Sequence, residues 1–545
     1  MIHRLFSLCS ILLLFTTASA NPSTKLIVVI VVDQCRYEYI ERFGSHLGKN
    51  GFNYLLKNGA NFTNASFKHA NTSTGPGHAV LLSGTYGNVN GIIANDWYDV
   101  SKRQWVYCVE DKTVHLVGSA GEGRSPRNFT GSMLGDELRL KTGFHAKVVS
   151  ISNKDRAAVL MAGTMPSGVF WMKDSVFVSS TYYMNDLPEW VKKFNQSRYV
   201  DSFFGRVWDK VLPDSAYRHM DDDDVPYEGE YDGMGRTFPH RITGRDSTKI
   251  TPSYYWSLAR SPFGAEVLKE FAKQAVDAEQ LGQRGVTDML CVSFSPTDII
   301  GHAYGPHSIE TMDAVVRMDA ILADFFAFLD KRVGLGNCVF VLSSDHGIAP
   351  IPEYMKRRYP SVDAGRIPVD SLKRYCSGVL TRRFGEPAGE DWIDAIGGNN
   401  IYFNRSTFKN MKVPTLEWAA SELADSLSQF YPIAAAYSSS QIISMPATTP
   451  VEKKIKRSFY RGRSGDVVYA LKPYWREGDK PQGAAHGEPY EYDAHVPLII
   501  AGGGIRPGRY PNEASPVDIA PTLSALLGIE FPAGRDGRVL IEAFK

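Results

Sequence analysis

The chain has 545 residues, of which 43% are hydrophobic and 22% charged, and a formal net charge of +1. This is an ordinary globular composition with ample material for a core, and the length allows two or three domains. A net charge so close to zero excludes an overall field that would recruit nucleic acid or an anionic membrane surface. Any attraction for an anionic partner must therefore be local.

The first twenty residues have the pattern of a secretory signal peptide. Arg4 gives a positive start, Leu5 to Thr17 is mostly apolar, and Ala18-Ser19-Ala20 matches the small-x-small cleavage pattern. We expect cleavage near Ala20 and a mature, periplasmic or secreted chain of residues 21–545. A membrane anchor is the alternative, but the apolar run is short for a span, and no later stretch is long and apolar enough to cross a bilayer.

Five cysteines follow this segment, an odd number that cannot pair completely within one chain. Cys291 and Cys338 lie in apolar, strand-like runs, where small buried thiols are expected. We therefore predict that disulfides do not hold the fold together, although one bridge is compatible with the count.

Several short runs rich in Val and Ile lack strict alternation and predict buried parallel strands. Helical spacing is clearest in Ile309 to Leu329 and recurs after Pro516. Strands that alternate with helices predict a doubly wound α/β fold, with a mostly parallel central sheet flanked by helices. The predicted strands are Leu26 to Val32, Lys147 to Ile151, Met289 to Phe294, Val339 to Leu342 and Val496 to Ala501.

Two stretches, about 184–250 and about 350–475, fit this sheet poorly. The first is polar and loop-rich, and its acidic run Asp221 to Asp224 is more typical of a solvated loop than of a calcium site. The second is mixed and includes the basic stretch Lys453 to Arg463. We interpret both as insertions in one domain, residues 21–545, and expect them to form walls or a lid around a site.

Polar residues of metal-binding and anion-binding type follow four of the predicted strands. Ligands of open α/β sheets bind beyond the carboxyl ends of the strands. One such residue alone would be an ordinary loop residue, but the same feature after four strands predicts a site. The residues are Asp33, Lys154 and Arg156, Asp298 and His302, and Asp345 and His346.

Two of these pairs have the composition of zinc ligands. Asp345 and His346 are adjacent at a strand end, so both can turn onto one cation, and zinc accepts this mixture of oxygen and nitrogen. The alternative is that Asp345 caps a turn and His346 is exposed. Asp298 and His302 are four residues apart, so on a helical turn they share a face, although such pairs are common on helices.

His486 adds a third imidazole, flanked by small residues that allow a close approach of the backbone. With Asp33 the set comprises three carboxylates and three imidazoles. Two tetrahedral zinc ions need about that many ligands, plus a nucleophile and a substrate oxygen in the open positions.

Thr74, in the sequence Thr-Gly-Pro-Gly-His, is the candidate nucleophile. A hydroxyl is a weak nucleophile at neutral pH, and coordination to zinc would lower its pKa. Gly75 and Gly77 would let a tight turn bring backbone N–H groups near a phosphate. Alternatively, Thr74 is the N-cap of a helix. Thr72 and Ser73 are rival hydroxyls that spacing does not exclude.

These motifs, in their order along the chain, resemble the alkaline phosphatase superfamily, and more narrowly its monomeric flavobacterial (PafA-type) members. The resemblance covers nearly the whole mature chain, from Asp33 to the closing Asp518-Ile-Ala-Pro-Thr-Leu segment. The motifs are Asp33 after a strand, Thr74-Gly-Pro-Gly-His, Asn95-Asp-Trp-Tyr, Lys154-Asp-Arg156, Asp298-x-x-x-His302, Asp345-His346-Gly and His486.

The resemblance implies a broad-specificity phosphate monoesterase with two zinc ions per chain. It assigns Asp298, His302 and His486 to one zinc, and Asp33, Asp345 and His346, with Thr74 Oγ, to the other. It also implies that Thr74 attacks phosphorus to give a covalent phosphothreonine, with net retention at phosphorus. Small-molecule phosphate monoesters are the expected partners of a monomer, with no dedicated nucleic-acid or membrane partner.

Asn95, Lys154 and Arg156 favour monoesters because a monoester phosphoryl group has three non-bridging oxygens and a dianionic charge, which such donors would stabilise. Lys154 and Arg156 are two apart, so on an extended segment they would point to one side. The alternative is an exposed basic loop. A phosphodiesterase would instead need an apolar pocket for its second ester group.

Two other functions remain open. The first is a phosphodiesterase or nucleotide pyrophosphatase on the same two-zinc scaffold, again with a threonine nucleophile. The second is a non-catalytic protein that binds phosphate or glycan, which would need a missing ligand or nucleophile. A sulfatase is disfavoured because no Cys/Ser-x-Pro-x-Arg segment stands at the nucleophile position.

Overall fold

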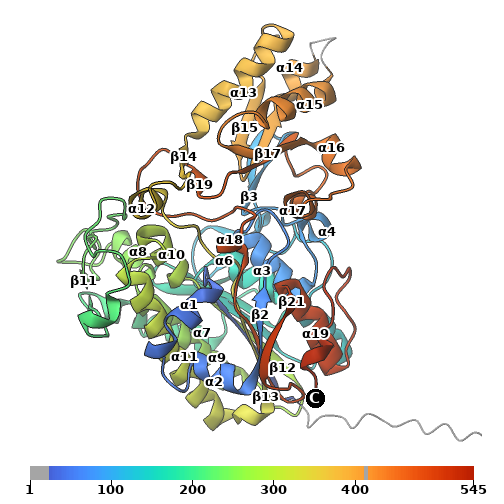
Figure 1. The fold of residues 1–545 in the computed structure, drawn as a ribbon. Helices are drawn as coiled ribbons and strands as arrows, with labels where there is room; N and C mark the ends of the chain where they lie inside the picture. Colours follow the sequence, from blue (N-terminus) through green and yellow to red (C-terminus); the bar gives the residue numbers. More distant parts are fainter. Residues whose placement is uncertain (1–23, 410–414) are drawn as a thin grey trace, which may run out of the picture.

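The computed structural model describes residues 24–409 and 415–545, so the predicted signal peptide, residues 1–20, lies outside the described residues. An eleven-stranded sheet forms the centre of the described chain (Figure 1). Its strands, in spatial order, are β21 (Gly508–Ala514), β2 (Gly59–Ala65), β20 (Leu498–Gly502), β13 (Cys338–Ser343), β1 (Leu26–Val32), β12 (Asp288–Phe294), β7 (Val148–Ser152), β8 (Gly168–Lys173), β9 (Val176–Ser180), β5 (Glu110–Val117) and β6 (Glu122–Arg124).

The middle of this sheet is parallel. β1 pairs in parallel with both β12 and β13, and β7 and β8 continue the parallel order beyond β12. Of the eleven strands only β20, β9 and β6 run against β1. The predicted fold class, a doubly wound α/β arrangement with a mostly parallel sheet, is confirmed. Each predicted strand lies within two residues of an observed one, and the predicted long helix is α11 (Ile309–Arg332).

One strand direction was predicted wrongly. Val496 to Ala501 was expected to be parallel, but β20 is antiparallel to both of its neighbours, β13 and β2. A continuous apolar run reports burial on both faces of a sheet, and all but the last residue of β20 is buried. Such a run carries no information on the direction of the strand. The chain enters β20 from the edge of the sheet at which β13 ends, so β20 runs in the opposite direction to β13.

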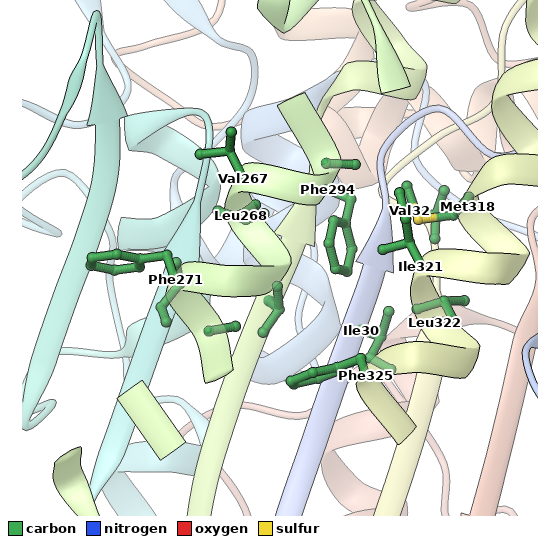
Figure 2. Packing of buried hydrophobic residues seen from close by; sticks show 14 of the residues in the cluster. Ile30, Val32, Val267, Leu268, Phe271, Phe294, Met318, Ile321, Leu322 and Phe325 are labelled. Carbon is green, nitrogen blue, oxygen red and sulfur yellow. The ribbon is translucent and has the colours of Figure 1, made fainter. Parts of the chain in front are cut away.

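β1 explains why such runs are apolar throughout. All seven of its residues are buried, and alternate side chains enter two different hydrophobic clusters. On one face, α9 (Pro262–Glu279) and α11 pack against the sheet, and Figure 2 shows Phe325 of α11 beside Ile30 and Phe271 of α9 near Leu268. On the other face lie α3 (Thr74–Ser83), α6 (Asp155–Ala162) and α19 (Ile519–Leu527).

Part of the stretch interpreted as the second insertion has a sheet and a core of its own. Its four antiparallel strands are covered by α13 (Val369–Phe384) and α15 (Leu416–Leu427), with Leu372, Leu423 and Tyr469 in the core. Figure 1 shows this segment in orange above the main sheet. The strands, in spatial order, are β15 (Ile393–Gly397), β16 (Asn400–Phe403), β18 (Val467–Leu471) and β17 (Ile433–Ser438).

The stretch interpreted as the first insertion is mostly irregular. It contains α7 (Glu189–Gln196), two short 3-10 turns and the two-residue strands β10 (Val207–Trp208) and β11 (His240–Arg241). All five cysteines of the described chain are buried and free, so no disulfide is formed there. No helix in the described ranges is both long and apolar enough to cross a membrane.

Candidate active site

The predicted metal ligands converge at one edge of the sheet, where its central strands end. Asp33 directly follows β1, and Asp298 and His302 lie on α10 (Pro296–Tyr304), the helix that follows β12. The predicted helical turn for this pair is therefore confirmed. Two groups form at this edge: Asp298, His302 and His486, and Asp33, Asp345 and His346.

Within each group the ligand atoms face one another. In the first, His302 Nε2 lies 3.2 Å from both Asp298 Oδ1 and His486 Nε2. In the second, His346 Nε2 lies 3.6 Å from Asp33 Oδ1 and 3.3 Å from Asp345 Oδ2. All ligand atoms of a group lie within 4.8 Å of one another, a spacing that one cation can bridge.

The three histidines are oriented by the backbone. His302 Nδ1 lies 2.9 Å from Ala484 O, His486 Nδ1 lies 2.8 Å from Thr72 O, and His346 Nδ1 lies 2.9 Å from Gly347 O. A carbonyl only accepts, so each Nδ1 carries the proton and donates it. Each Nε2 is then left with a free lone pair turned inward, which is the arrangement of metal-binding histidines.

The charge balance also fits bound cations. Three buried carboxylates, those of Asp33, Asp298 and Asp345, meet the ammonium group of Lys154, which contacts Asp33 Oδ2 at 2.7 Å and Asp298 Oδ2 at 2.5 Å. Asp33 Oδ1 and Asp345 Oδ2 are buried with no hydrogen-bond partner among the described residues. Burial, and then the charge of Asp345, hold the pKa of Asp33 well above its usual range. These residues fit two zinc ions in number and chemistry.

Thr74 stands at the second group. Its Oγ1 lies 3.5 Å from His346 Nε2 and 3.3 Å from the Arg156 Nη2 atom. The capping interpretation was wrong, because Thr74 is the first residue of α3 and Ser73 occupies the N-cap position, without a side-chain cap bond. α3 comes this close because of Gly77: a Cβ there would lie 2.1 Å from the backbone oxygen of Asp345.

The rival hydroxyls point to other groups. Thr72 Oγ1 donates to the backbone oxygen of Glu488 at 2.9 Å, and Ser73 Oγ donates to Asn71 Oδ1 at 2.5 Å. Of the three hydroxyls, that of Thr74 has the contacts to the metal-ligand group and to Arg156.

Lys154 and Arg156 do meet at this edge, but not on the extended segment that we predicted. Lys154 is extended and immediately precedes α6, and Arg156 lies in the first turn of that helix. The run Ala157 to Ala162 is buried and rich in good helix formers, and Asp155 Oδ1 accepts the Arg156 backbone N–H at 2.7 Å. The helix therefore begins one residue before Arg156.

Asn95 lies beside the turn that contains Thr74 and Gly75, immediately before β3 (Asp96–Asp99). Its Oδ1 accepts the Gly75 backbone N–H at 2.7 Å. The amide group of Asn95 thus has its acceptor occupied, and its Nδ2 donor remains for a ligand. Asn95, His302 and His486 line one shared cavity.

Comparisons with known proteins identify a sequence family and several relatives that match this chain over most of its length. Residues 27–488 match the family model described as type I phosphodiesterase / nucleotide pyrophosphatase. Alkaline phosphatase PhoV of Synechococcus elongatus is 35% identical over 97% of this chain and 94% of its own length. Alkaline phosphatase PafA of Elizabethkingia meningoseptica is 34% identical over 96% of this chain and 95% of its own.

The crystal structure of PafA matches this structure with a TM-score of 0.90 at 33% identity, covering 96% of this chain and 99% of that one. This chain belongs to the alkaline phosphatase superfamily. The predicted resemblance is confirmed, and the chain is an alkaline phosphatase of the PafA type, a phosphoric monoester hydrolase. It belongs equally to the phosphodiesterase and nucleotide pyrophosphatase sequence family that spans residues 27–488.

Two side chains of this phosphatase that touch the site residues were missed in the sequence. Gln34 Nε2 donates to Asp298 Oδ1 at 2.5 Å, and its backbone N–H donates to Asp345 Oδ1 at 3.1 Å. Gln34 thus binds a carboxylate of each metal group. In the sequence, only its position directly after Asp33 could have indicated that Gln34 belongs to the site.

Tyr107 is the second missed residue. Its hydroxyl donates to Asp155 Oδ1 at 2.5 Å and accepts from the Arg156 Nη1 atom at 3.4 Å. Asp155 also accepts from Arg124 Nε at 2.8 Å. Asp155 therefore does not face solvent but fixes the tyrosine that supports Arg156. Nothing in the local sequence around Tyr107 indicates this contact, because it joins β4 (Gln104–Tyr107) to the start of α6.

Proposed function

We propose that this phosphatase cleaves phosphate monoesters through a covalent phosphothreonine at Thr74, with two zinc ions bound by the two ligand groups. The contact of Thr74 Oγ1 with both His346 and Arg156 carries the proposal, because it puts a hydroxyl between a metal ligand and a cation. Zinc supplies Lewis-acid charge that lowers the pKa of a bound hydroxyl or water and neutralises developing negative charge.

The residues of the chain then have defined tasks. The Thr74 hydroxyl gives up its proton, and its Oγ forms a bond to phosphorus as the bond to the ester oxygen breaks. The leaving oxygen departs on the opposite side and takes up a proton to give the alcohol. Water later loses a proton as it attacks phosphorus, and Thr74 Oγ is released and reprotonated. Asn95, Lys154 and Arg156 hold the non-bridging oxygens of the phosphoryl group, which favours a dianion. Two inversions give net retention at phosphorus.

The metal content tests the two-zinc model. We expect about two zinc ions per chain in active protein, loss of activity on chelation, and recovery on addition of zinc. Elemental analysis of the same preparations that are assayed for activity measures this. Full activity with fewer than two ions per chain would contradict the model.

The substrate preference tests the reaction class. We expect a clearly higher kcat/KM for p-nitrophenyl phosphate than for bis-p-nitrophenyl phosphate, because Lys154 and Arg156 complement the dianion. The sequence family shared with phosphodiesterases makes the diester the necessary comparison. A clear preference for the diester would replace our proposal by the phosphodiesterase or nucleotide pyrophosphatase function.

Broad specificity, a monomeric state and a periplasmic or secreted location complete the proposal. The location is supported by the signal-peptide pattern of the first twenty residues and the monomer by the resemblance to PafA-type phosphatases. In this proposal the second insertion forms part of the wall of the site, because residues 398–399 and Trp475 line its cavity. The residues that line this cavity do not include any from the first insertion, about 184–250.

A further inference from the structure

A chamber of about 410 Å³ opens directly above the first metal-ligand group. His302 and His486 form part of its floor, and Trp475 and Arg476 of β19 (Trp475–Glu477) contribute to its wall. The His302 side chain is 41% exposed, whereas Asp298 is buried, so this group is open toward the chamber. A sphere of that volume is about 9 Å across, enough for a small organic group but not for a macromolecule.

In the proposed reaction the first metal-ligand group is nearest to the oxygen that leaves. The alcohol part of the substrate must then occupy this chamber, because the other side of the phosphoryl group faces Thr74. Side chains of the chamber wall therefore contact the leaving group, and their chemistry indicates which leaving groups bind well.

Arg476 belongs to this wall, and its guanidinium group forms no ion pair with a carboxylate of the described residues. Its Nη1 atom donates to the backbone oxygen of Gly483 at 3.0 Å, and its Nε atom donates to the backbone oxygen of Glu477 at 3.2 Å. Among the described residues no carboxylate lies within 4.0 Å of its guanidinium, and no hydrogen bond is made by its Nη2 atom. This leaves one side of the guanidinium fork free.

Arg366 provides an internal comparison. Its Nη2 atom also donates to the Gly483 oxygen, at 3.0 Å, but its Nε and Nη2 atoms are paired with the Glu353 carboxylate at 2.8 and 2.6 Å. Two guanidinium groups thus share one carbonyl, and a carboxylate pairs with only one of them. Burial, and then the charge of Arg366, lower the pKa of Arg476 to about 10, which still leaves it protonated at neutral pH.

Among the described residues, the acids that line the chamber form no ion pair with Arg476 within 4.0 Å, although the charge of Glu477 acts on it from farther away. Glu477 turns its carboxyl group to the hydroxyl of Tyr469. Glu488 accepts from Asn399 Nδ2 at 3.0 Å and from the Leu471 backbone N–H at 3.2 Å. Asp96 is the third acid of the lining, and partial burial, opposed by the charge of Arg156, raises the pKa of its carboxyl group.

We propose that Arg476 binds a second anionic group on the leaving alcohol, either a carboxylate or a second phosphate. Arg476 is half-buried, and a guanidinium with free donors in such a place binds best to an anion that fits its planar fork. The preferred substrates are then phosphate monoesters whose alcohol carries another negative charge at the far end of the chamber. This inference rests on the proposed function, because it needs the leaving group to lie in the chamber.

Three aryl phosphates test it: phenyl phosphate, 4-carboxyphenyl phosphate and 1,4-phenylene bisphosphate. For each, kcat/KM is measured with the zinc-loaded wild type and with R476Q. We expect R476Q to lower kcat/KM for at least one charged substrate about tenfold more than for phenyl phosphate. Because kcat/KM for each substrate is divided by its wild-type value, differences in intrinsic reactivity among the three substrates cancel. The two charged substrates distinguish a carboxylate site from a phosphate site.

R366Q is the matched control, because Arg366 holds the same Gly483 carbonyl but is paired with Glu353. We expect it to change kcat/KM for all three substrates by the same factor. An equal loss on all three with R476Q would overturn the proposal and leave Arg476 as an anchor of the loop that carries His486. If glutamine at 476 prevents folding, R476K replaces it. Lysine keeps the positive charge but not the planar fork. The ratio of kcat/KM for the preferred charged substrate to kcat/KM for phenyl phosphate should therefore fall about threefold in R476K. The same ratio as in the wild type would overturn the proposal.

The proposed function and this inference fail separately. If the wild type does not hydrolyse phenyl phosphate when loaded with two zinc ions, the proposed function fails. If it does, and R476Q loses activity evenly, only the role of Arg476 fails.

Discussion

Thr74→Ala is expected to abolish turnover of phosphate monoesters, with a fall in kcat of at least about 10³-fold. The substitution removes the oxygen that would form the covalent bond to phosphorus. The two ligand groups contain six other side chains, so both zinc ions should remain bound. Activity and metal content measured on the same sample separate a lost nucleophile from a lost metal site.

The covalent intermediate gives a direct measurement. Wild-type enzyme quenched with acid during turnover should yield a phosphopeptide that contains Thr74, and Thr74→Ala should yield none. Ser73→Ala is the matched control, because its hydroxyl is adjacent but bound to Asn71 at 2.5 Å. A labelled Ser73 or Thr72, or unchanged turnover in Thr74→Ala, would assign the nucleophile elsewhere.

Arg156→Ala should lower kcat/KM for monoesters by about 10²-fold or more, and for diesters much less. The Arg156 guanidinium reaches Thr74 Oγ1 at 3.3 Å and is supported by Tyr107 at 3.4 Å. A phosphoryl group on Thr74 would therefore present its oxygens to this cation. A diester carries one charge fewer, so it loses less when the cation is removed.

The measurement is kcat/KM for p-nitrophenyl phosphate and for the bis ester, in the wild type and the variant. Arg127→Ala is the control, because Arg127 is 62% exposed and pairs with Asp111 away from the metal groups. It should change neither rate. Equal losses on both substrates in Arg156→Ala would remove the argument that this residue selects monoesters.

The six predicted metal ligands could be found from the sequence for a physical reason. Asp33, Asp298 and Asp345 follow buried apolar strands, and parallel strands deliver the residues that follow them to one edge. Their partners His302 and His346 are local in sequence. His486 lacks such a signal, and only the resemblance to a known family linked it to Asp298.

The rest could not be predicted because it depends on contacts between distant segments. Gln34 and Tyr107 have no motif of their own, and their roles arise where β1 and β4 meet α10 and α6. The direction of β20 was invisible because burial on both faces produces the same apolar run in either direction. Arg476 became a candidate only when the chamber and the pairing of Arg366 were known.

The antiparallel pairing of β13 and β20 has a consequence for how this enzyme can evolve. Ser343 is the pairing partner of Leu498, so everything between them is topologically the loop of a hairpin. That loop contains Asp345, His346 and His486, together with the small sheet and the part of the chamber wall that includes Trp475 and Arg476. The entropic cost of closing a loop rises by only about 0.6 kcal/mol for each doubling of its length. Substrate range can therefore diversify by lengthening, trimming or exchanging one loop while the register of the catalytic sheet stays unchanged.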